Sequence, residues 1–433
     1  MQQRNNAKKI YEAAVAAVQP ALLLRQHLAV TATGICIGTQ QFNIPIKSVV
    51  VIGAGKAAAA MAQTTETILG SYIKAGIIST KYEHALPLQT IHCMEAAHPV
   101  PDEKSLEAIQ QTIQLLQQTK PGDIVLCLIS GGASSLWADV PHGCTLQELQ
   151  ETFQLLLKSG AAIDEMNCIR RHLSSIKGGQ LLRYAPKATW FTLMISDVPG
   201  DKAEAIASGP TTADPSTFAD AWTVVEQYQL QQRLPATVIN HLQNGLKGIV
   251  AETIKPNDPL LQQVQNQIIG SNNVALTAAA AKAEELGYTV LLQQELLTGD
   301  AAATAEAIVQ QAKQYRGLKP ACLLFGGETT VTVTGNGKGG RNQHLALCAL
   351  KHLLPDDKIT LLAAGTDGTD GPTDAAGAFA DAASAKAINE NKNLLLEAIQ
   401  QNDAYHFFEN VNGLLKTGAT QTNVMDIITV LLD

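Results

Sequence analysis

Short apolar runs alternate along the chain with longer segments that are rich in Ala, Leu and Gln. The runs have the length and apolar continuity of buried strands, whereas segments such as 106–118 and 274–286 have the composition of helices. We interpret as strands the runs 48–52, 124–129, 190–195, 267–269, 289–293, 321–325, 330–334, 359–363 and 426–432. This alternation predicts an α/β fold with largely parallel sheets covered by helices on both faces, and ligands at the carboxyl ends of the strands.

The length of the chain predicts more than one domain. It has 433 residues, and single hydrophobic cores stop growing beyond about 250–300 residues. The segment 255–259 is polar, contains two prolines and separates two helical regions. We therefore predict two α/β domains, residues 1–255 and a smaller domain of residues 256–433.

A glycine-rich loop in the second half follows the run 330–334. It contains Lys338, Gly339, Gly340 and Arg341 and leads into an apolar helical segment. Glycine lets backbone N–H groups approach a ligand closely, and such a loop at a helix start favours anions. With its two cations, this loop predicts a site for a phosphate or a carboxylate.

A similar loop in the first half follows the run 48–52 and contains Gly53, Gly55 and Lys56. Lys56 inside the turn is suited to a phosphate. Two predicted anion-binding loops, one in each half of the chain, predict an enzyme that holds a charged substrate in a cleft between its domains.

Three further segments are candidates for binding. Ser130, Gly131 and Gly132 follow a buried-strand pattern and suit a carboxylate or phosphate oxygen, although a tight turn with serine capping explains them equally well. Lys177 stands beside a glycine pair, and the arginines at 170 and 171 before it fit a solvated helix face. Asn272 closes another strand and is expected either to cap the next helix or to bind a ligand.

Carboxylates follow two of the predicted strands. Asp197 and Asp201 come after the run 190–195, and Asp367 begins a loop in which acids alternate with glycines. A carboxylate at a strand's carboxyl end can accept a hydroxyl proton or hold a metal, whereas an Asx-turn explains Asp201. The loop after Asp367 lacks the glutamate at the twelfth position of a calcium loop, so we reject that interpretation.

The segment from Gly53 to Ala58 also fits the pattern G-x-G-x-x-A of dinucleotide-binding proteins. The acid expected about 20 residues later is missing, because the next apolar run leads to Lys81. No Walker A sequence and no protein-kinase motif is present.

Net charge, cysteine spacing and the length of the apolar runs indicate the class of protein and its compartment. The formal net charge is −8, which favours neither nucleic acid nor an anionic membrane as a partner. Seven cysteines occur without a CxxC pair, as is typical of reduced thiols in a cytoplasmic protein. We find no signal peptide and no apolar run of the ~18 residues that a spanning helix needs.

Several segments together resemble the type-2 glycerate kinase family, whose C-terminal half is of the MOFRL type. The resemblance extends in order from about residue 7 to the C-terminus. It rests on Gly53–Ala57, His98–Asp102, Ser130–Ser134, Arg171–Gly179, Ser196–Asp201, Ser208–Thr211, Gly327–Thr329, Gly339–Gln343 and Gly365–Gly368. It implies ATP-dependent, Mg²⁺-requiring phosphorylation of D-glycerate to 2-phosphoglycerate, in a cleft between a Rossmann-like N-terminal domain and a smaller α/β domain.

The resemblance points to two central cations, and we assign the other roles from the chemistry of direct phosphoryl transfer, which depends mostly on positioning and charge neutralisation. Lys56 and Arg341 form the central cationic pair, with the backbone of Ser130–Gly132 as a complement. Asp197 is the candidate base or metal organiser, Asp367 the alternative metal carboxylate, and Glu328 orients either of them; the sequence does not assign the metal ligands. The chain departs from the family pattern at residues 202, 344, 419 and 421, none of which we assign to chemistry.

Two other functions remain open at this point. The glycine fingerprint fits an NAD(P)-dependent hydroxypyruvate reductase, which would need a ribose-binding residue where only Lys81 is found. A non-catalytic sensor of small organic acids would not need so many carboxylates at strand ends. No pattern in the sequence specifies an oligomeric state.

Overall fold

The computed structural model describes residues 2–389 and 392–433, which form two compact units. The central unit is Pro20–Ile269, and the terminal unit combines the residues up to Gln19 with Gly270–Asp433. Both units pair a sheet with helices, so the predicted α/β class is confirmed. In the described part of the chain, no helix is long and apolar enough to cross a membrane.

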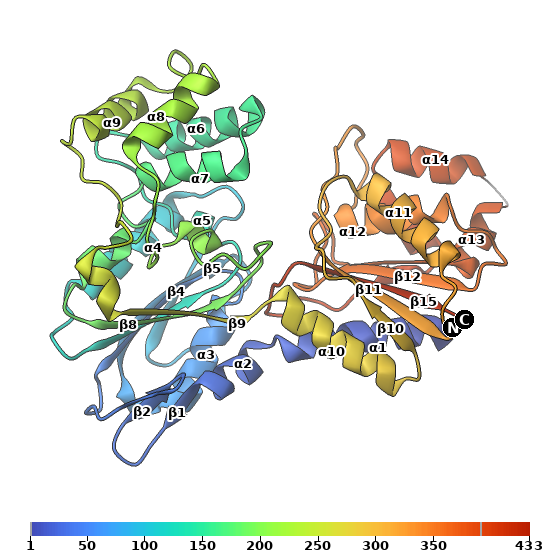
Figure 1. Ribbon diagram of the computed structural model, residues 1–433, viewed down its shortest axis with the longest axis horizontal. Helices are drawn as coiled ribbons and strands as arrows, with labels where there is room; N and C mark the ends of the chain where they lie inside the picture. The colour runs from blue at the N-terminus through green and yellow to red at the C-terminus, as the bar shows by residue number, and fades with distance from the viewer. Residues whose placement is uncertain (1, 390–391) are drawn as a thin grey trace. The chain divides into compact units, whose positions relative to one another are not determined.

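The central unit is built on a six-stranded sheet with the strand order β6-β5-β4-β7-β8-β9 (Figure 1). Its strands are β4 (Val49–Ala54), β5 (Ile73–Lys81), β6 (Ile91–Ala96), β7 (Ile124–Ile129), β8 (Thr189–Ile195) and β9 (Val264–Gly270). The four pairings from β6 to β8 are parallel, as predicted. Every residue of β4 and β7 is buried, because helices cover both faces of a parallel sheet.

Helices cover the two faces of this sheet. On one face lies α3 (Ala58–Leu69), which also packs against α2 (Pro20–His27); on the other lie α4 (Glu103–Leu116) and the short α5 (Ala133–Leu136). A small antiparallel sheet packs beside α3; its strands are β1 (Leu28–Val30), β2 (Ile35–Ile37) and β3 (Gln40–Phe42). Because β4, β7 and β8 are adjacent and parallel, their carboxyl ends are neighbours at one edge of the sheet.

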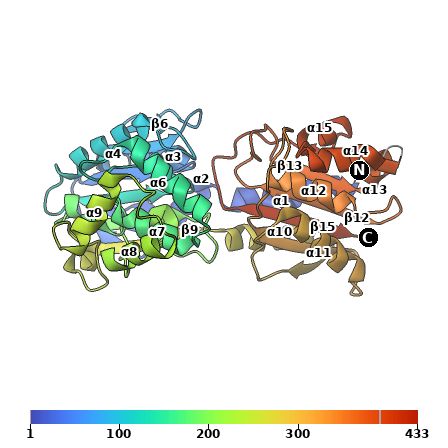
Figure 2. The same ribbon diagram turned by 90° about the horizontal axis from the view of Figure 1, so that it is seen from above.

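Four helices of the central unit form a separate cluster with its own core (Figures 1 and 2). This helical cluster consists of α6 (Leu146–Ser159), α7 (Ile163–His172), α8 (Phe218–Gln227) and α9 (Ala236–Leu246). Thr145 and Thr217 begin α6 and α8 with capping boxes, each completed by an acid three residues later. Apolar residues spaced three or four positions apart, such as Leu149, Phe153 and Leu156, pack in the core of the cluster.

The terminal unit has a six-stranded sheet with the order β10-β11-β15-β12-β13-β14. Its strands are β10 (Thr289–Leu292), β11 (Ala321–Gly327), β12 (Ile359–Gly365), β13 (Gly377–Asp381), β14 (Leu414–Leu415) and β15 (Asp426–Leu432). Only β10 and β11 pair in parallel, and the other four pairings are antiparallel. The prediction of largely parallel sheets is therefore wrong for this unit, because β15 enters between β11 and β12 in the opposite direction.

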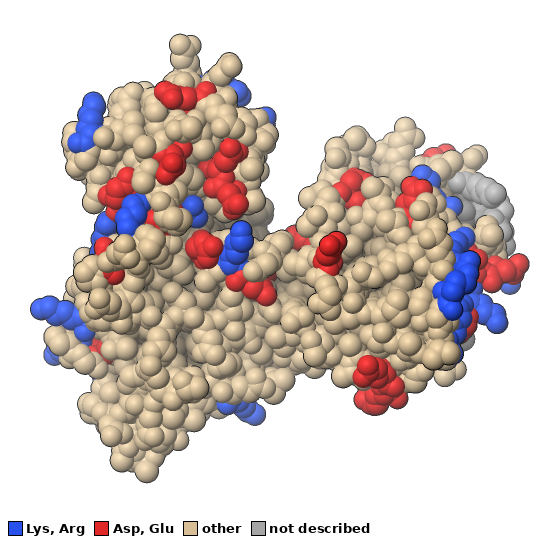
Figure 3. All heavy atoms as spheres, in the orientation of Figure 1, with Lys and Arg blue, Asp and Glu red and all other residues tan. Residues whose placement is uncertain are grey.

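Helices again lie on both faces of the sheet (Figure 1). On one face α1 (Gln2–Ala17) packs against α10 (Asn272–Glu285), and on the other α11 (Ala301–Gln314) packs against α12 (Arg341–Leu350). Three shorter helices follow β13: α13 (Ala382–Asn389), α14 (Lys392–Gln400) and α15 (Ala404–Asn410). On the face drawn in Figure 3, acidic and basic side chains are dispersed among uncharged ones.

The unit boundaries differ from the predicted division at residues 255 and 256. The segment after residue 256 forms a short 3₁₀ helix, Pro259–Gln263, and then β9, and its apolar side chains pack on the core of the central unit. The first helix belongs instead to the terminal unit, since α1 contacts α10, β12 and β15.

The run 330–334 is not a strand, contrary to the prediction. Only an isolated bridge between Asp300 and Thr330 forms there, and Val333 is 71% exposed. Threonine and valine give this run a β-type composition, but among the residues that the structure describes it forms no ladder with a neighbouring strand, and of its two valines only Val331 packs against the core.

Candidate functional site

The two glycine loops of the central unit lie against each other. β4 and β7 pair in parallel up to Ala54 and Ile129, so the residues that follow both strands emerge side by side. The N–H of Lys56 donates to the carbonyl of Gly131 over 2.9 Å, and the N–H of Ala57 donates to Oγ of Ser130 over 3.0 Å. The structure thus brings together loops that are more than 70 residues apart in the sequence.

Glycine at positions 53 and 55 is required by this packing. A Cβ atom on Gly55 would lie 2.2 Å from Oγ of Ser130, and one on Gly53 would lie 2.5 Å from the carbonyl oxygen of Leu128. Gly55 also has a φ of 133°. Because the N–H groups of Lys56 and Ala57 are engaged inside the protein, the cradle predicted at this loop does not include them.

His98 is a neighbour of this site to which the sequence assigned no role. A Cβ atom on Gly132 would lie 2.8 Å from Cδ2 and 2.9 Å from Nε2 of the His98 ring. Gly132 itself has a φ of 83° and begins α5. Asp197 lies two residues beyond β8, and its position at the same sheet edge follows from the parallel pairing of β7 and β8.

Lys177 is buried beside the segment that follows β7. Its ammonium group donates to the carbonyl of Trp137 over 3.1 Å and lies 4.0 Å from Oδ1 of Asp139. Burial lowers the pKa of Lys177. Asp139 in turn accepts hydrogen bonds from the hydroxyl groups of Ser174 and Ser175, which fixes the segment before Lys177.

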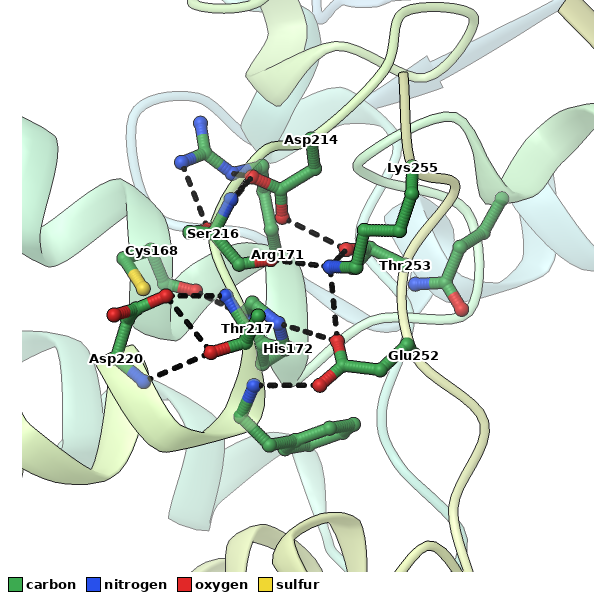
Figure 4. Close-up of polar contacts among 12 residues, drawn as sticks. Cys168, Arg171, His172, Asp214, Ser216, Thr217, Asp220, Glu252, Thr253 and Lys255 are labelled. Carbon is green, nitrogen blue, oxygen red and sulfur yellow. Dashed lines mark hydrogen bonds and ion pairs between the residues drawn. The ribbon is translucent and has the colours of Figure 1, made fainter. Parts of the chain in front are cut away.

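The arginines before Lys177 do not lie on a solvated helix face, as the sequence had indicated. Arg171 forms an ion pair with the fully buried Asp214, with 3.1 Å between Nε and Oδ1 (Figure 4). Next to this pair, Glu252 accepts a hydrogen bond from the N–H of Phe218 and lies 3.0 Å from the ammonium group of Lys255. These contacts fix α7 and the start of α8 to the segments that lead into α8 and out of α9.

Arg341, the first residue of α12, is held by two carboxylates. Its Nε and Nη2 atoms donate to Asp426 over 2.6 and 2.8 Å, and Nη1 lies 3.1 Å from Glu328. Burial by itself would lower the pKa of Arg341, but the neighbouring carboxylates raise it, so the guanidinium stays charged. Asp426 was not among the predicted site residues. The sequence signal for it is an acid that opens an otherwise apolar strand.

Strand pairing explains why these groups meet. Asp426 begins β15 and pairs with Gly327 at the end of β11 and with Gly365 at the end of β12. The residues that follow these two strands, including Glu328 and Asp367, therefore emerge at the same edge. Asp367 accepts hydrogen bonds from the N–H and the hydroxyl of Thr369 over 3.0 and 3.2 Å.

The start of α12 is occupied by a side chain of the protein. Asp370 accepts hydrogen bonds from the N–H groups of Asn342 and Gln343 over 3.1 and 2.8 Å. A Cβ atom on Gly340 would lie 2.3 Å from the carboxylate of Asp370, which explains the glycine. Burial and the nearby Asp426 outweigh the two N–H groups and raise the pKa of Asp370 to about 7.

The rest of this glycine-rich loop is also docked on the protein. The N–H groups of Gly335, Gly337 and Lys338 donate to residues 401–403, which connect α14 and α15. The ammonium group of Lys338 lies 4.3 Å from the centre of the Tyr405 ring. The N–H groups on both sides of Gly339 and Gly340 are therefore engaged within the protein, and an anion site at these two glycines stays a prediction. Arg341 is the cation of this loop that stands among site residues.

Asn272 does not cap a helix. It is the first residue of α10, and its amide group donates to the carbonyls of Val424 and Asp426 over 2.8 and 3.0 Å. It thereby fixes the start of β15, and with it the carboxylate that holds Arg341. Within the described residues, no group of three or more His, Cys, Asp or Glu side chains is placed to hold a metal ion.

Comparisons with known proteins agree along the whole chain. Residues 6–243 match a family described as a domain of unknown function (DUF4147), and residues 321–426 match the MOFRL family. The glycerate 2-kinase of Pyrococcus horikoshii is 41% identical, with 96% of this chain and 94% of the relative covered. A protein of Agrobacterium vitis, provisionally named a hydroxypyruvate reductase, is 37% identical, with 99% and 94% covered. The crystal structure of a glycerate kinase of Thermotoga maritima has a TM-score of 0.86 and 35% identity, and all of both chains is covered.

Proposed function

The chain belongs to the glycerate kinase family, and we propose that it transfers the γ-phosphoryl group of ATP to the 2-hydroxyl of D-glycerate. The observation that carries this proposal is 41% identity to a glycerate 2-kinase over 96% of the chain. The products are ADP and 2-phosphoglycerate. In the reaction, the bond between the γ-phosphorus and the β–γ bridging oxygen breaks, and a bond from the substrate oxygen to the γ-phosphorus forms.

We assign the phosphoryl group to the loop edge of the central unit. Lys56 follows β4, and its backbone N–H is fixed on the carbonyl of Gly131. The side chain that carries the ammonium group is therefore attached to a rigid backbone. A fixed cation stabilises charge that develops on the phosphoryl oxygens more effectively than a mobile one. Asp197, at the end of the neighbouring strand, is the proposed acceptor of the hydroxyl proton.

We assign a second anionic group, the glycerate carboxylate or the transferring phosphoryl, to Arg341. Its fork is oriented by Asp426 and Glu328, which removes the need to order a long side chain during binding. Glu328 and Asp367 remain candidates for orienting the substrate or the metal, since both follow strands that end beside Asp426.

A requirement for Mg²⁺ is also part of the proposal. The described residues form no cage of three or more metal-binding side chains. Mg²⁺ in kinases is commonly bound by one or two carboxylates together with substrate phosphates, so it would arrive with the nucleotide and neutralise phosphate charge. We further propose that the enzyme works in the cytoplasm, because all seven cysteines are free thiols.

The alternative of a nicotinamide-dependent reductase rested on the glycine fingerprint of Gly53 and Gly55. Dinucleotide binding needs a glycine turn whose backbone lies open to the pyrophosphate. In this chain the turn is closed by Ser130 and Gly131, which accept the N–H groups of Ala57 and Lys56. A binding protein without catalytic activity has no specific observation in its favour.

Incubation with ATP, MgCl₂ and D-glycerate, followed by ³¹P and ¹H NMR of the product, tests the proposal. We expect 2-phosphoglycerate and ADP in equal amounts, and no ADP when glycerate or Mg²⁺ is omitted. Formation of 3-phosphoglycerate would refute the position of transfer, and oxidation of NADH with hydroxypyruvate at a comparable rate would support the reductase.

A further inference from the structure

A cavity of about 280 Å³ lies wholly within the central unit. It is bordered by α6 and α7 of the helical cluster, by the segment Pro99–Pro101 after β6, and by residues 134–138 after β7. Ser134 belongs to α5, directly after the Ser130–Gly132 loop, so the cavity adjoins the loop edge that we assign to the phosphoryl group. Small-molecule sites typically occupy such a concave position between two substructures.

The wall of the cavity is mostly apolar and includes one aromatic ring. Phe153, Leu149 and Leu157 line it from α6, and Val100 lines it from the opposite side. Leu157 is 62% and Val100 is 55% exposed, so both leave apolar surface at the opening of the cavity. An exposed apolar rim of this kind is typical of a ligand-binding site.

A cation without a carboxylate partner stands in this wall. The guanidinium of Arg170 lies 5.0 Å from the centre of the Phe153 ring and donates through Nη1 to Oδ1 of Asn167 over 3.4 Å, while its buried Nε atom has no hydrogen-bond partner. Within the described part of the chain no acid forms an ion pair with Arg170, whereas the adjacent Arg171 is paired with Asp214. Lys177 lines the same cavity. A charge such as that of Arg170, which is partly buried and has no ion-pair partner among the described acids, is costly unless a bound anion neutralises it.

The apolar wall indicates which substrate enters. D-glycerate has three carbons that carry a carboxylate and two hydroxyl groups, so it presents almost no apolar surface. A nucleoside combines a flat heteroaromatic base, which can lie against Phe153 and Leu157, with a phosphate chain that suits two cations. The amide of Gln154 at the rim can bind the edge of a base.

We propose that this cavity binds the nucleotide, with the adenine base against Phe153 and the phosphate chain between Arg170 and Lys177. The inference rests on the proposed kinase activity and assigns the binding of ATP, the phosphoryl donor, to the central unit. The helical cluster then has a function of its own, because α6 and α7 supply one side of the nucleotide site.

Steady-state kinetics of four variants test this assignment. For Arg170→Gln we expect KM for ATP to rise about tenfold or more, because the phosphate chain loses a charge-assisted hydrogen bond. For Phe153→Leu we expect KM for ATP to rise because the base loses its aromatic partner, while KM for D-glycerate changes less than about twofold in both variants. Lys158→Ala is the matched control, because Lys158 is an exposed cation of α6 outside the cavity wall. Arg170→Lys should recover part of the affinity. A rise in KM for glycerate instead of ATP would overturn the proposal.

Calorimetric titration of the whole chain separates this inference from the proposed reaction. We expect ADP to bind more weakly to Arg170→Gln and to Phe153→Leu than to the wild type. Adenosine should bind more weakly to Phe153→Leu only, because adenosine has no phosphate for Arg170. Unchanged ADP affinity in both variants, with unchanged melting temperatures, would refute the cavity as a nucleotide site. If the wild type binds ADP but phosphorylates no glycerate, the proposed reaction fails and the nucleotide assignment stands.

Discussion

Arg341 and Lys56, the two cations that we assign to the reaction, differ in how they are held. Arg341 is locked by two carboxylates, one of which, Asp426, has a side chain that is only 2% exposed. Lys56 is fixed through its backbone N–H, which Gly131 accepts. Removal of either charge should strongly reduce activity, but the consequences for stability should differ, because only Arg341 is the partner of a buried carboxylate.

Lys56→Met should reduce kcat by about 10²- to 10³-fold, the usual loss when one preorganised group that stabilises developing charge is removed. The melting temperature should stay within about 1 °C, because the hydrogen bonds of this loop involve the backbone and Ser130, which the substitution leaves intact. Lys120→Met, at an exposed lysine before β7, is the control. Retention of more than about a tenth of the wild-type rate would contradict the role of Lys56.

Arg341→Ala should destabilise the protein as well as inactivate it, because Asp426 would remain buried without its partner. We expect a loss of about 1–3 kcal/mol in the free energy of unfolding, measured by urea denaturation. The double variant Arg341→Met with Asp426→Asn should recover much of this stability and none of the activity. Equal stability of Arg341→Ala and the wild type would indicate that water replaces the guanidinium.

At the scale of elements, the start of α12 is stabilised by a carboxylate that burial disfavours. Asp370 accepts two N–H groups of the first helical turn, yet its pKa is raised to about 7 by burial and by Asp426. A raised pKa means that the folded protein holds this proton more tightly than the unfolded chain, whose aspartates titrate near pH 4. The contribution of this group to stability is thus full below about pH 4 and is lost as the pH rises to about 7.

The substitution Asp370→Asn should remove this pH dependence while keeping one acceptor for the helix N-terminus. The melting temperature of the wild type, relative to that of Asp370→Asn, should therefore fall between pH 4 and pH 7 and stay level above about pH 8. Asp374→Asn is a suitable control, because Asp374 is exposed in the same loop and its pKa is lowered by hydrogen bonds from Tyr405 and Lys416. A constant difference across this range would show that Asp370 stays ionised.

At the scale of the whole molecule, the proposed reaction uses residues from both units. Lys56 belongs to the central unit and Arg341 to the terminal unit. Groups that act in one transition state are strongly non-additive when they are removed together. The double variant Lys56→Met with Arg341→Ala should therefore have about the same kcat/KM as the less active of the two single variants. Multiplied losses, measured as kcat/KM, would indicate that the two residues act in separate steps.

Most of the fully buried strands were predictable from the sequence, and so was the edge at which the loops after β4 and β7 meet. Fully buried strands such as β4 and β7 appear as continuous apolar runs, since both faces of the sheet are covered. Loops that follow such strands must emerge at a common edge when the strands are parallel, which is why Lys56 and Ser130 could both be chosen. The exposed run 330–334 has the same β-type composition, but composition does not reveal whether a partner strand exists.

Only the tertiary structure decided what satisfies each polar group. The glycines at 339 and 340 look like an open anion cradle in the sequence, yet Asp370 and residues 401–403 accept the N–H groups around them. Asp426 becomes the partner of Arg341 because β15 runs antiparallel between β11 and β12, a pairing that no local pattern specifies. Local sequence determines which segments form strands and which loops can turn tightly, because those properties depend on neighbouring residues. Hydrogen-bond partners and strand direction depend on residues distant in the chain, so they are settled only when the sheet assembles.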